Sequence, residues 1–399
     1  MSLRRIRIKN FRCLADVDIQ FPSHTVLFGP NGAGKTTFLD TLWFVRDCAI
    51  NGVSAASESR SHGIGLLWDK APEDARITLE IHGESSIYAL SVGFSSGRIE
   101  PFVGERLLQT GTESLLFERS VGSDKITIYS ALEGTTRTLQ EPDQLALRTF
   151  QDSSPEARES NGILRFATLY QARYALFPQL RRYGSERGHE VRLQSRCDNL
   201  WSVLANLIIK REFDARYDKI MWYMRKSFPG FKGLDIENTG PNSVYCSFVD
   251  SRRQKPIKAS GVSDGHLQML AHLTSLFSVP QGGTSLVLLD EPEVSLHPGP
   301  LAALADAIKE ASSPPWNRQV IVATHSPVLM SQFEPEHVFT TSFGPDASTR
   351  IQRVDAIEGI GDLLEEYALG SLYMAGAVGE QHVSDPGTRS SPTPPLAPA

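Results

Sequence analysis

Long apolar runs and paired cysteines are both missing from this chain of 399 residues. No apolar stretch approaches the roughly 20 residues that cross a bilayer, and the basic first residues lead into alternating positions, so we expect neither a membrane span nor a signal peptide. None of the cysteines forms a C-x-x-C pair, which indicates a reducing cytosol and disfavours a zinc site or a disulfide framework. The four cysteines are Cys13, Cys48, Cys197 and Cys246.

The overall composition is ordinary for a globular protein, with 40% hydrophobic and 22% charged residues, but the charge is unevenly spread. The net charge is −6, yet residues 165–258 hold 18 Lys and Arg against 9 Asp and Glu. This basic region is equally consistent with a solvated helical surface and with an anion-binding surface for DNA, RNA or an acidic partner.

Residues 29–36 fit the phosphate-loop pattern G-x-x-x-x-G-K-[ST]. An apolar stretch at 26–28 predicts a strand before them, and the helical spacing of residues 37–45 predicts a helix after them. The glycines let backbone N–H groups surround an anion at the helix N-terminus, where Lys35 would reach the β- and γ-phosphates of a nucleoside triphosphate and Thr36 would ligate Mg²⁺. A Gly-rich loop with a solvated lysine is the alternative. The nucleotide-binding candidates are Gly29, Pro30, Asn31, Gly32, Ala33, Gly34, Lys35, Thr36 and Thr37.

Two later apolar strands end in polar residues suited to ATP hydrolysis. The strand at 286–289 leads into Asp290, which we expect to hold Mg²⁺, and Glu291, which we expect to act as general base. The strand at 319–324 leads into His325, which would contact the γ-phosphate or the attacking water. Taken alone, the acids could be solvated strand ends, and a lone histidine is more often structural.

Ser263, Asp264 and Gly265 form a turn before an apolar helical pattern at 267–277. Such a turn is an anion-binding arrangement at a helix N-terminus, and it is also an ordinary N-cap. The spacing does not choose between the two.

The periodicity of the chain predicts its organisation. Residues 3–9, 16–21 and 76–139 alternate with a period of two, which predicts two strands and an antiparallel β lobe. A helical pattern begins at about 156, with Asp198 as an N-cap candidate and an apolar face that continues or restarts through Phe213 to Phe228. We therefore divide the chain into an N-terminal half of an ATPase head (1–150), a basic helical insertion or lid (151–235), a C-terminal half (236–378) and a tail (379–399).

These motifs together resemble the ATP-binding-cassette (ABC) heads of the SMC, RecF and OLD group, most closely the stand-alone AAA family ATPases of bacterial defence and repair loci. Five segments in sequence order carry the resemblance, and they lie between residues 3 and 330: 6–12 (Ile-Arg-Ile-Lys-Asn-Phe-Arg), the phosphate loop, 262–265, 289–298 and 323–327. The segment Val-Ser-Asp-Gly-His at 262–266 differs from the transporter signature Leu-Ser-Gly-Gly-Gln, which disfavours a transport ATPase.

The resemblance implies an α/β fold: a P-loop NTPase with an ABC-type head, comprising a mixed central sheet and an antiparallel β lobe, plus the helical insertion. It also implies a homodimer or higher oligomer in which two heads enclose two ATP molecules. The Ser263-Asp264-Gly265 turn of one copy would close on nucleotide held by the Lys35 loop of the other. Residues 295–297 would match the D-loop. The Q-loop glutamine is unclear, with Gln109 as a weak candidate.

Features of related proteins are missing. No sustained heptad repeat is present, so we expect no coiled-coil arm. The 74 residues after His325, with a Pro/Ser/Thr-rich tail that we expect to be disordered, leave no room for the nuclease domain of OLD proteins. Any nuclease output would belong to another polypeptide.

We therefore predict a cytoplasmic, Mg²⁺-dependent ATPase that acts as a switch for a separate effector, a nuclease in our first hypothesis, in anti-phage defence or DNA maintenance. One alternative is a RecF/SMC-like repair ATPase that grips DNA through residues 165–258. Another is a scaffold that binds nucleotide without hydrolysing it, which Glu291 disfavours.

Overall fold

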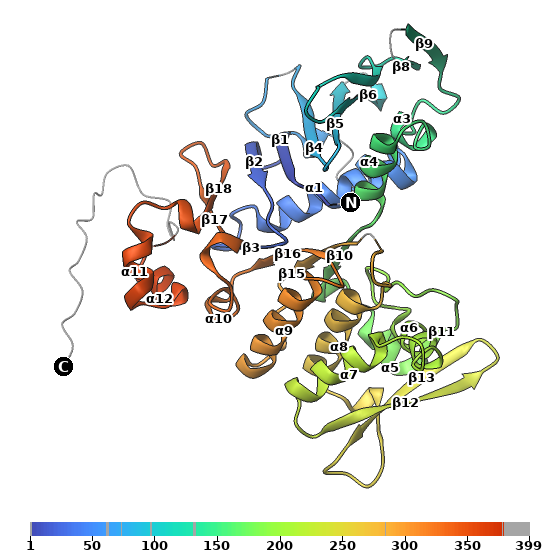
Figure 1. Ribbon diagram of the computed structural model, residues 1–399, viewed down its shortest axis with the longest axis vertical. Helices are drawn as coiled ribbons and strands as arrows, with labels where there is room; N and C mark the ends of the chain where they lie inside the picture. Colours follow the sequence, from blue (N-terminus) through green and yellow to red (C-terminus); the bar gives the residue numbers. More distant parts are fainter. Residues whose placement is uncertain are drawn as a thin grey trace.

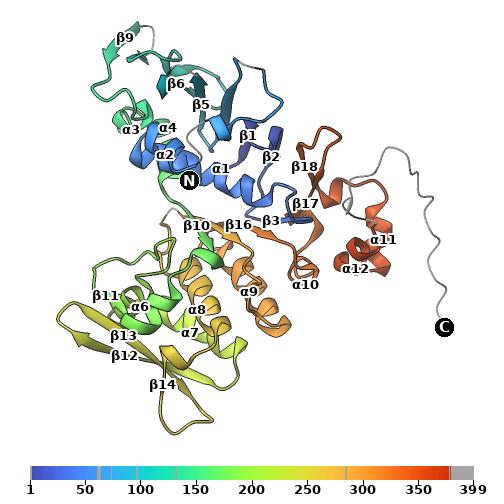
Figure 2. The same cartoon turned by 180° about the vertical axis from the view of Figure 1, so that it is seen from behind.

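The computed structural model describes residues 2–60, 64–72, 74–95, 98–130, 133–283, 285–376 and 378 (Figures 1 and 2). The tail expected at 379–399 lies outside the described residues. None of the helices within the described ranges is long and apolar enough to cross a membrane.

The first sheet is antiparallel throughout and has the strand order β2-β1-β4-β5-β6-β7-β8-β9. Its alternating apolar residues are buried on one face, as Ile6 and Ile8 of β1 show. The strands predicted at 3–9 and 16–21 and the antiparallel lobe predicted at 76–139 are confirmed. The strands are β1 (Arg5–Phe11), β2 (Leu14–Gln20), β4 (Arg76–His82), β5 (Ser86–Ser95), β6 (Arg98–Gln109), β7 (Leu115–Arg119), β8 (Lys125–Ser130) and β9 (Glu133–Thr138).

The second sheet is the central one, with the order β10-β15-β16-β3-β17-β18. Its strands are parallel except for β18, so the sheet is mixed as expected. Strand β3 lies between β16 and β17, which come from the other end of the chain. The strands are β3 (His24–Phe28), β10 (Ala167–Gln171), β15 (Leu286–Asp290), β16 (Gln319–Thr324), β17 (Val338–Phe343) and β18 (Thr349–Arg353).

Both faces of the central sheet are buried, which explains why its strands are almost entirely apolar. Val26 and Phe28 of β3 pack into a core shared with α6 to α9, whereas Leu27 packs into the core beneath the antiparallel sheet. Figure 1 shows α1 between the two sheets, with α8 and α9 on the opposite face of the central sheet. The helices of these layers are α1 (Lys35–Asn51), α2 (Val53–Glu58), α3 (Ala146–Thr149), α4 (Pro155–Arg165), α6 (Leu200–Ile209), α7 (Arg216–Ser227), α8 (Asp264–Phe277) and α9 (Pro298–Ala311).

A third, small sheet belongs to the basic region and pairs in the order β11-β13-β12, with β14 on β13. It packs with α6 and α7, as Figure 2 shows. Three short helices, α10 to α12, lie near β17 and β18. The remaining elements are α5 (Phe177–Tyr183), β11 (Ser185–Glu186), β12 (Phe231–Gly240), β13 (Ser243–Asp250), β14 (Ile257–Lys258), α10 (Pro327–Met330), α11 (Ile360–Glu366) and α12 (Leu369–Met374).

Three predictions about the middle of the chain need correction. Helix α6 begins at Leu200 with Asn199, not Asp198, at the N-cap position. Phe213, which we expected on the apolar face, is 90% exposed because it lies in the turn between α6 and α7; the apolar face restarts in α7 at Tyr217. A boundary at residue 151 places β10 in the insertion, although β10 pairs with β15 in the central sheet. The rest of the domain division stays a prediction.

Candidate functional site

The phosphate loop connects β3 to α1 at the carboxyl end of the central sheet. Gly32 and Gly34 adopt φ of 80° and 92°, a backbone conformation that strongly favours glycine. Gly29 must also lack a side chain, since a Cβ atom there would collide with the carbonyl oxygen of Thr341 in β17. The strand, loop and helix predicted around residues 29–36 are therefore present, and the helix N-terminus faces the loop.

Lys35 is the first residue of α1 and is 5% exposed. Its Nζ atom donates hydrogen bonds to the carbonyl oxygens of Gly29 and Pro30, at 2.8 Å and 2.9 Å. Burial lowers the pKa of the Lys35 ammonium, while the nearby carboxylates of Glu291 and Asp290 raise it. The cation is thus held inside the loop next to the acids at the end of β15.

Thr36 and Asp290 come from distant parts of the sequence and meet at this end of the sheet. The Thr36 hydroxyl donates to Oδ1 of Asp290 at 3.0 Å. Burial raises the pKa of the Asp290 carboxyl, although hydrogen bonds from Gln171 and Thr36 counteract part of that rise. A hydroxyl beside a buried carboxylate is a set of hard oxygen ligands, and a divalent cation would balance the carboxylate charge. These residues fit a Mg²⁺ site.

The glutamine that contacts Asp290, next to Thr36, is Gln171 and not Gln109. Gln171 ends β10, the neighbour of β15, and its Nε2 donates to Oδ2 of Asp290 at 2.6 Å. Gln109 ends β6 in the antiparallel sheet, where its amide donates to Glu156. Gln109, the weak candidate from the sequence, therefore does not contact Asp290, and Gln171 does. Gln171 follows a short apolar stretch, the same pattern that identified Asp290 and His325.

Glu291 and His325 lie beside one another past the ends of β15 and β16. Oε1 of Glu291 is 3.8 Å from Nδ1 of His325, and the two side chains are 44% and 46% exposed. Glu291 has φ of 52°, a left-handed conformation that is unusual for a residue with a side chain and recurs at functional sites. A half-exposed acid next to a half-exposed imidazole can take up a proton from water that enters between them.

Glu293, which the sequence did not single out as a site residue, holds the turn that carries His325. Its Oε1 accepts hydrogen bonds from the Thr324 hydroxyl at 2.7 Å and from the His325 backbone N–H at 2.9 Å. The same oxygen lies 3.3 Å from Nδ1 of His325, and the Glu293 side chain is 8% exposed. The orientation of His325 therefore depends on this buried carboxylate.

The turn at 263–265 begins α8, and its Asp264 lies on the side of the molecule that carries Thr36 and Asp290. Ser263 occupies the N-cap position without capping the helix, and its hydroxyl lies 2.8 Å from Nδ1 of His266. Asp264 forms an ion pair with Arg181 at 2.7 Å. Both Ser263 and Asp264 are exposed, whereas a Cβ atom on Gly265 would press against the carbonyl oxygen of Ser295.

A cavity of about 410 Å³ joins this turn to the metal-site residues. Ser263 is not part of its wall; it lines a separate cavity. Within one copy of the chain, then, the cavity brings Asp264, but not Ser263, to the same space as Thr36. The lining includes Thr36, Gln171, Arg173, Asp264, Asp290, Glu291 and Ser295.

Most of the chain matches one known protein family. Residues 25–331 match the family described as "AAA domain, putative AbiEii toxin, Type IV TA system". The chain belongs to this family. Within the matched residues lie the phosphate loop, Asp290 and Glu291, which the fold brings to one end of the central sheet.

Individual relatives match the AAA-domain protein only over short segments. It is 57% identical over 40 residues to the OLD nuclease of Thermus scotoductus, which is 10% of this chain and 8% of the relative. It is 42% identical over 71 residues to protein ea59 of Escherichia phage lambda, 18% of this chain and 13% of the relative. It is 38% identical over 63 residues to the DNA replication and repair protein RecF of Bacteroides thetaiotaomicron, which is 16% of this chain and 17% of the relative. The matches thus span less than a fifth of each relative.

Solved structures support the fold of the AAA-domain protein over nearly its whole length. The Smc head bound to the C-winged helix domain of ScpA has a TM-score of 0.53 at 15% identity, covering 88% of this chain and 97% of that one. The Pyrococcus furiosus Smc head with an extended coiled coil, bound to the C-terminal domain of ScpA, has a TM-score of 0.52 at 13% identity, covering 92% and 100%. The predicted P-loop, ABC-type head is confirmed.

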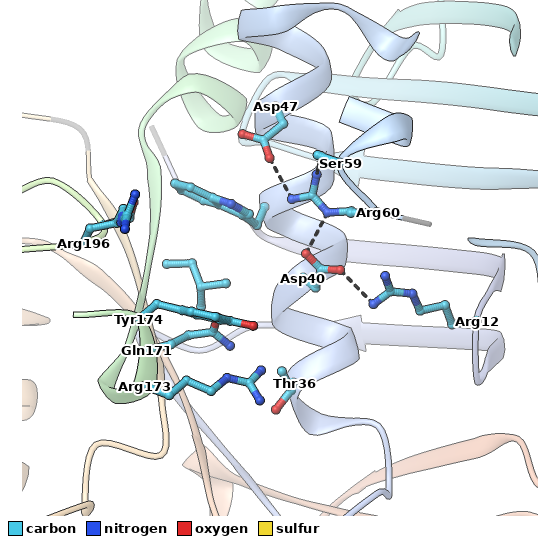
Figure 3. Close-up of a pocket in the computed structure, with 13 residues that line it drawn as sticks. Arg12, Thr36, Asp40, Asp47, Ser59, Arg60, Gln171, Arg173, Tyr174 and Arg196 are labelled. Carbon is cyan, nitrogen blue, oxygen red and sulfur yellow. Dashed lines mark hydrogen bonds and ion pairs between the residues drawn. The ribbon is translucent and has the colours of Figure 1, made fainter. Parts of the chain in front are cut away.

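A second cavity of the AAA-domain protein, about 580 Å³, opens between α1 and the segment that follows β10 (Figure 3). One wall is a chain of ion pairs in which Asp40 joins Arg12 at 2.9 Å to Arg60 at 2.8 Å, and Arg60 reaches Asp47 at 2.7 Å. Arg12 belongs to the Asn-Phe-Arg segment noted in the sequence. Figure 3 also shows Arg173 extending toward Thr36, a placement that no sequence motif indicated.

Proposed function

We propose that this chain binds Mg²⁺ and ATP, hydrolyses ATP at a site completed by a second copy, and acts as a switch for a separate effector. The observation that carries the proposal is the meeting of Thr36, Asp290 and Gln171 beside the phosphate loop. It joins three separate segments of the chain, with Thr36 254 positions from Asp290 and Gln171 119 positions from it.

Each residue has a role that follows from its position. The loop N–H groups and Lys35 bind the phosphates, and Thr36 with Asp290 holds Mg²⁺, which neutralises phosphate charge when bound. Glu291 accepts the proton of the attacking water, and His325 orients that water or the γ-phosphate. Gln171 keeps the Asp290 carboxylate oriented toward Thr36.

Exposure supports the need for a second copy. Glu291 and His325 are each nearly half exposed, so water reaches them freely in a single chain. Hydrolysis by a positioned water is favoured when bulk water is excluded. The exposed Ser263-Asp264 turn at the N-terminus of α8 offers N–H groups that suit an anion, and it is the surface we propose to close over the phosphate loop of the partner copy.

Two variants test the site and the dimer separately. Lys35→Ala should remove ATP binding, measured by calorimetry, because the phosphates lose their buried cation. Glu291→Gln should retain ATP binding and accumulate an ATP-bound dimer in gel filtration, because closure is intact while proton transfer is not. The composite-site proposal is wrong if Glu291→Gln with ATP elutes as a monomer.

The same Glu291→Gln variant addresses the scaffold alternative. A protein that only holds nucleotide releases phosphate no faster than the variant does. Phosphate release by the wild type that is lost in Glu291→Gln would exclude the scaffold.

The effector is proposed to be a nuclease on another polypeptide, in anti-phage defence or DNA maintenance. Support comes from the sequence similarity to an OLD nuclease over a segment of this chain and from the resemblance to stand-alone defence ATPases. The test is co-expression with the neighbouring reading frames, followed by affinity purification and nuclease assay with wild type and Glu291→Gln. Neighbours that encode no nuclease, together with no co-purifying partner, would refute this part.

A second candidate function, DNA binding through residues 165–258, is favoured by the excess of basic residues there and by the segment shared with RecF. Some of that charge is already paired, as in the salt bridges from Lys219 to Glu310 and from Lys226 to Asp306, which reduces the positive charge available to DNA phosphates. DNA binding predicts DNA-stimulated ATP turnover and affinity that falls steeply with salt. Salt-insensitive or undetectable binding excludes it.

A further inference from the structure

Two histidines stack at the end of the central sheet opposite the phosphate loop. His24 is the first residue of β3, and His337 ends the 3₁₀ turn Pro335–His337 that leads into β17. Their ring centroids are 3.9 Å apart with an interplanar angle of 7°. Glu334, just before that turn, places Oε2 3.9 Å from Nδ1 of His337.

The nitrogens of this pair lack the partners that buried polar atoms normally have. His24 is 6% exposed, and its Nε2 atom is buried without a hydrogen-bond partner; Nδ1 of His337 is in the same state. A buried polar atom without a partner costs about 1–3 kcal/mol, so such an atom in a folded protein calls for an explanation. Two such nitrogens within 4.8 Å of one another and of a carboxylate oxygen point to a shared ligand.

We propose that His24, Glu334 and His337 form a binding site for a divalent transition metal, with Zn²⁺ the best match. One ligand atom from each residue lies within 4.8 Å of the others. Two imidazoles and a carboxylate are a common zinc ligand set, with water in the fourth position. The cysteine spacing disfavours a zinc site with cysteine ligands and does not bear on histidine ligands.

Neighbouring residues hold His24 and Glu334 in orientations that suit a metal ligand. Nδ1 of His24 lies 3.3 Å from the Ser23 hydroxyl, which can accept the Nδ1–H proton and so leave the Nε2 lone pair for the ligand. Lys309 donates to Oε1 of Glu334 at 3.0 Å, which leaves Oε2 facing His337.

Metal binding requires a local adjustment. Zn–N bonds are about 2.0–2.1 Å long, and lone pairs of nearly parallel rings do not converge on one point. The two rings must therefore tilt apart as the Glu334 carboxylate moves inward. Glu334 is exposed, and His337 is partly exposed, so both have room to move. The competing explanation is a neutral stacked pair that packs against Phe333 without a metal.

The bound metal would fasten the start of β3 to the turn before β17. These strands are paired in register, and β17 contacts the phosphate loop where Thr341 packs on Gly29. The expected role is structural, holding the two strands that frame the loop, and it is independent of the ATPase proposal.

The test is Zn²⁺ titration of the full chain by calorimetry in excess Mg²⁺, with the bound metal counted by elemental analysis. We expect one Zn²⁺ per chain and a higher melting temperature when it is bound. His337→Gln and Glu334→Gln change residues with exposed surface and should each weaken affinity at least about tenfold, because each removes a ligand. The matched control is His325→Gln, which alters the histidine beside the ATPase acids and should leave Zn²⁺ affinity unchanged.

Substitution of Co²⁺ for Zn²⁺ provides a direct spectroscopic readout. A four-coordinate nitrogen and oxygen site gives strong visible absorption, which His337→Gln should abolish while circular dichroism confirms the fold. The proposal is overturned if the wild type binds no Zn²⁺, if both ligand variants bind as tightly as the wild type, or if His325→Gln is the variant that loses binding.

Discussion

Replacing Glu293 with alanine should disable the turn that carries His325 while leaving nucleotide binding intact. The carboxylate accepts one hydrogen bond from the Thr324 hydroxyl and one from the His325 backbone N–H. The variant Glu293→Ala removes both. Among the described residues, Glu293 acts on the phosphate loop only through its charge, which raises the pKa of Lys35, so it acts on catalysis through His325 as a positioning residue.

The magnitude follows from the two bonds. A hydrogen bond to a charged acceptor stabilises a protein by about 1.5–3 kcal/mol. The His325 N–H can donate to water instead, because the His325 side chain is half exposed. The Thr324 hydroxyl cannot reach water, because Thr324 is fully buried. About one such bond is therefore lost without replacement. If that energy holds His325 in place, kcat falls about 10- to 100-fold, since 1.36 kcal/mol corresponds to tenfold.

Steady-state ATPase assays measure this effect. We expect Glu293→Ala to lower kcat with little change in KM for ATP, and Glu293→Gln to recover most of the activity because its amide oxygen still accepts both bonds. The exposed acid Glu212 supplies a control, with Glu212→Ala expected to match the wild type. Activity of Glu293→Ala within about twofold of the wild type, or equal losses in both Glu293 variants, would refute the positioning role.

Three further predictions concern buried polar groups. Gln171→Ala should raise the Mg²⁺ concentration for half-maximal ATPase activity about tenfold, because the buried Asp290 carboxylate loses a hydrogen bond, while Gln109→Ala should leave it unchanged. Because burial raises the pKa of Asp290 and Mg²⁺ needs the ionised form, the Mg²⁺ requirement should grow as pH falls, and a flat requirement would contradict this. Burial lowers the pKa of His272 to about 4, so the unfolded state takes up the proton first as pH falls below about 6.5. The free energy of unfolding should then decrease by up to about 3 kcal/mol toward pH 4, and denaturant titrations of His272→Leu should show a shallower decrease.

The parts of the site that lie in contiguous motifs were predictable from the sequence. The phosphate loop needs glycines at fixed spacing, and two of them take up left-handed backbone conformations. The strand ending in Asp290 is a short apolar run because both its faces are buried. In both cases local chemistry and fold impose the same residues, so the pattern is readable without the structure.

Residues that act through pairing between distant strands were not predictable in this way. Gln171 reaches Asp290 only because β10 pairs with β15, and β10 is a five-residue strand within a region of helical patterns. Glu293 is two positions past Glu291, where spacing alone gives no reason to expect a bond to Thr324. The exposed Phe213 shows the same limit, since helical periodicity carries no record of where one helix stops and the next begins.

The position of β3 between β16 and β17 has a consequence for synthesis of the protein. The strand that carries the phosphate loop leaves the ribosome early, but both strands that flank it end beyond residue 320. During translation the antiparallel sheet, whose strands all lie before residue 139, can pair while β3 still lacks both neighbours. The proposed ATP site can therefore be completed only after β16 and β17 have been synthesised.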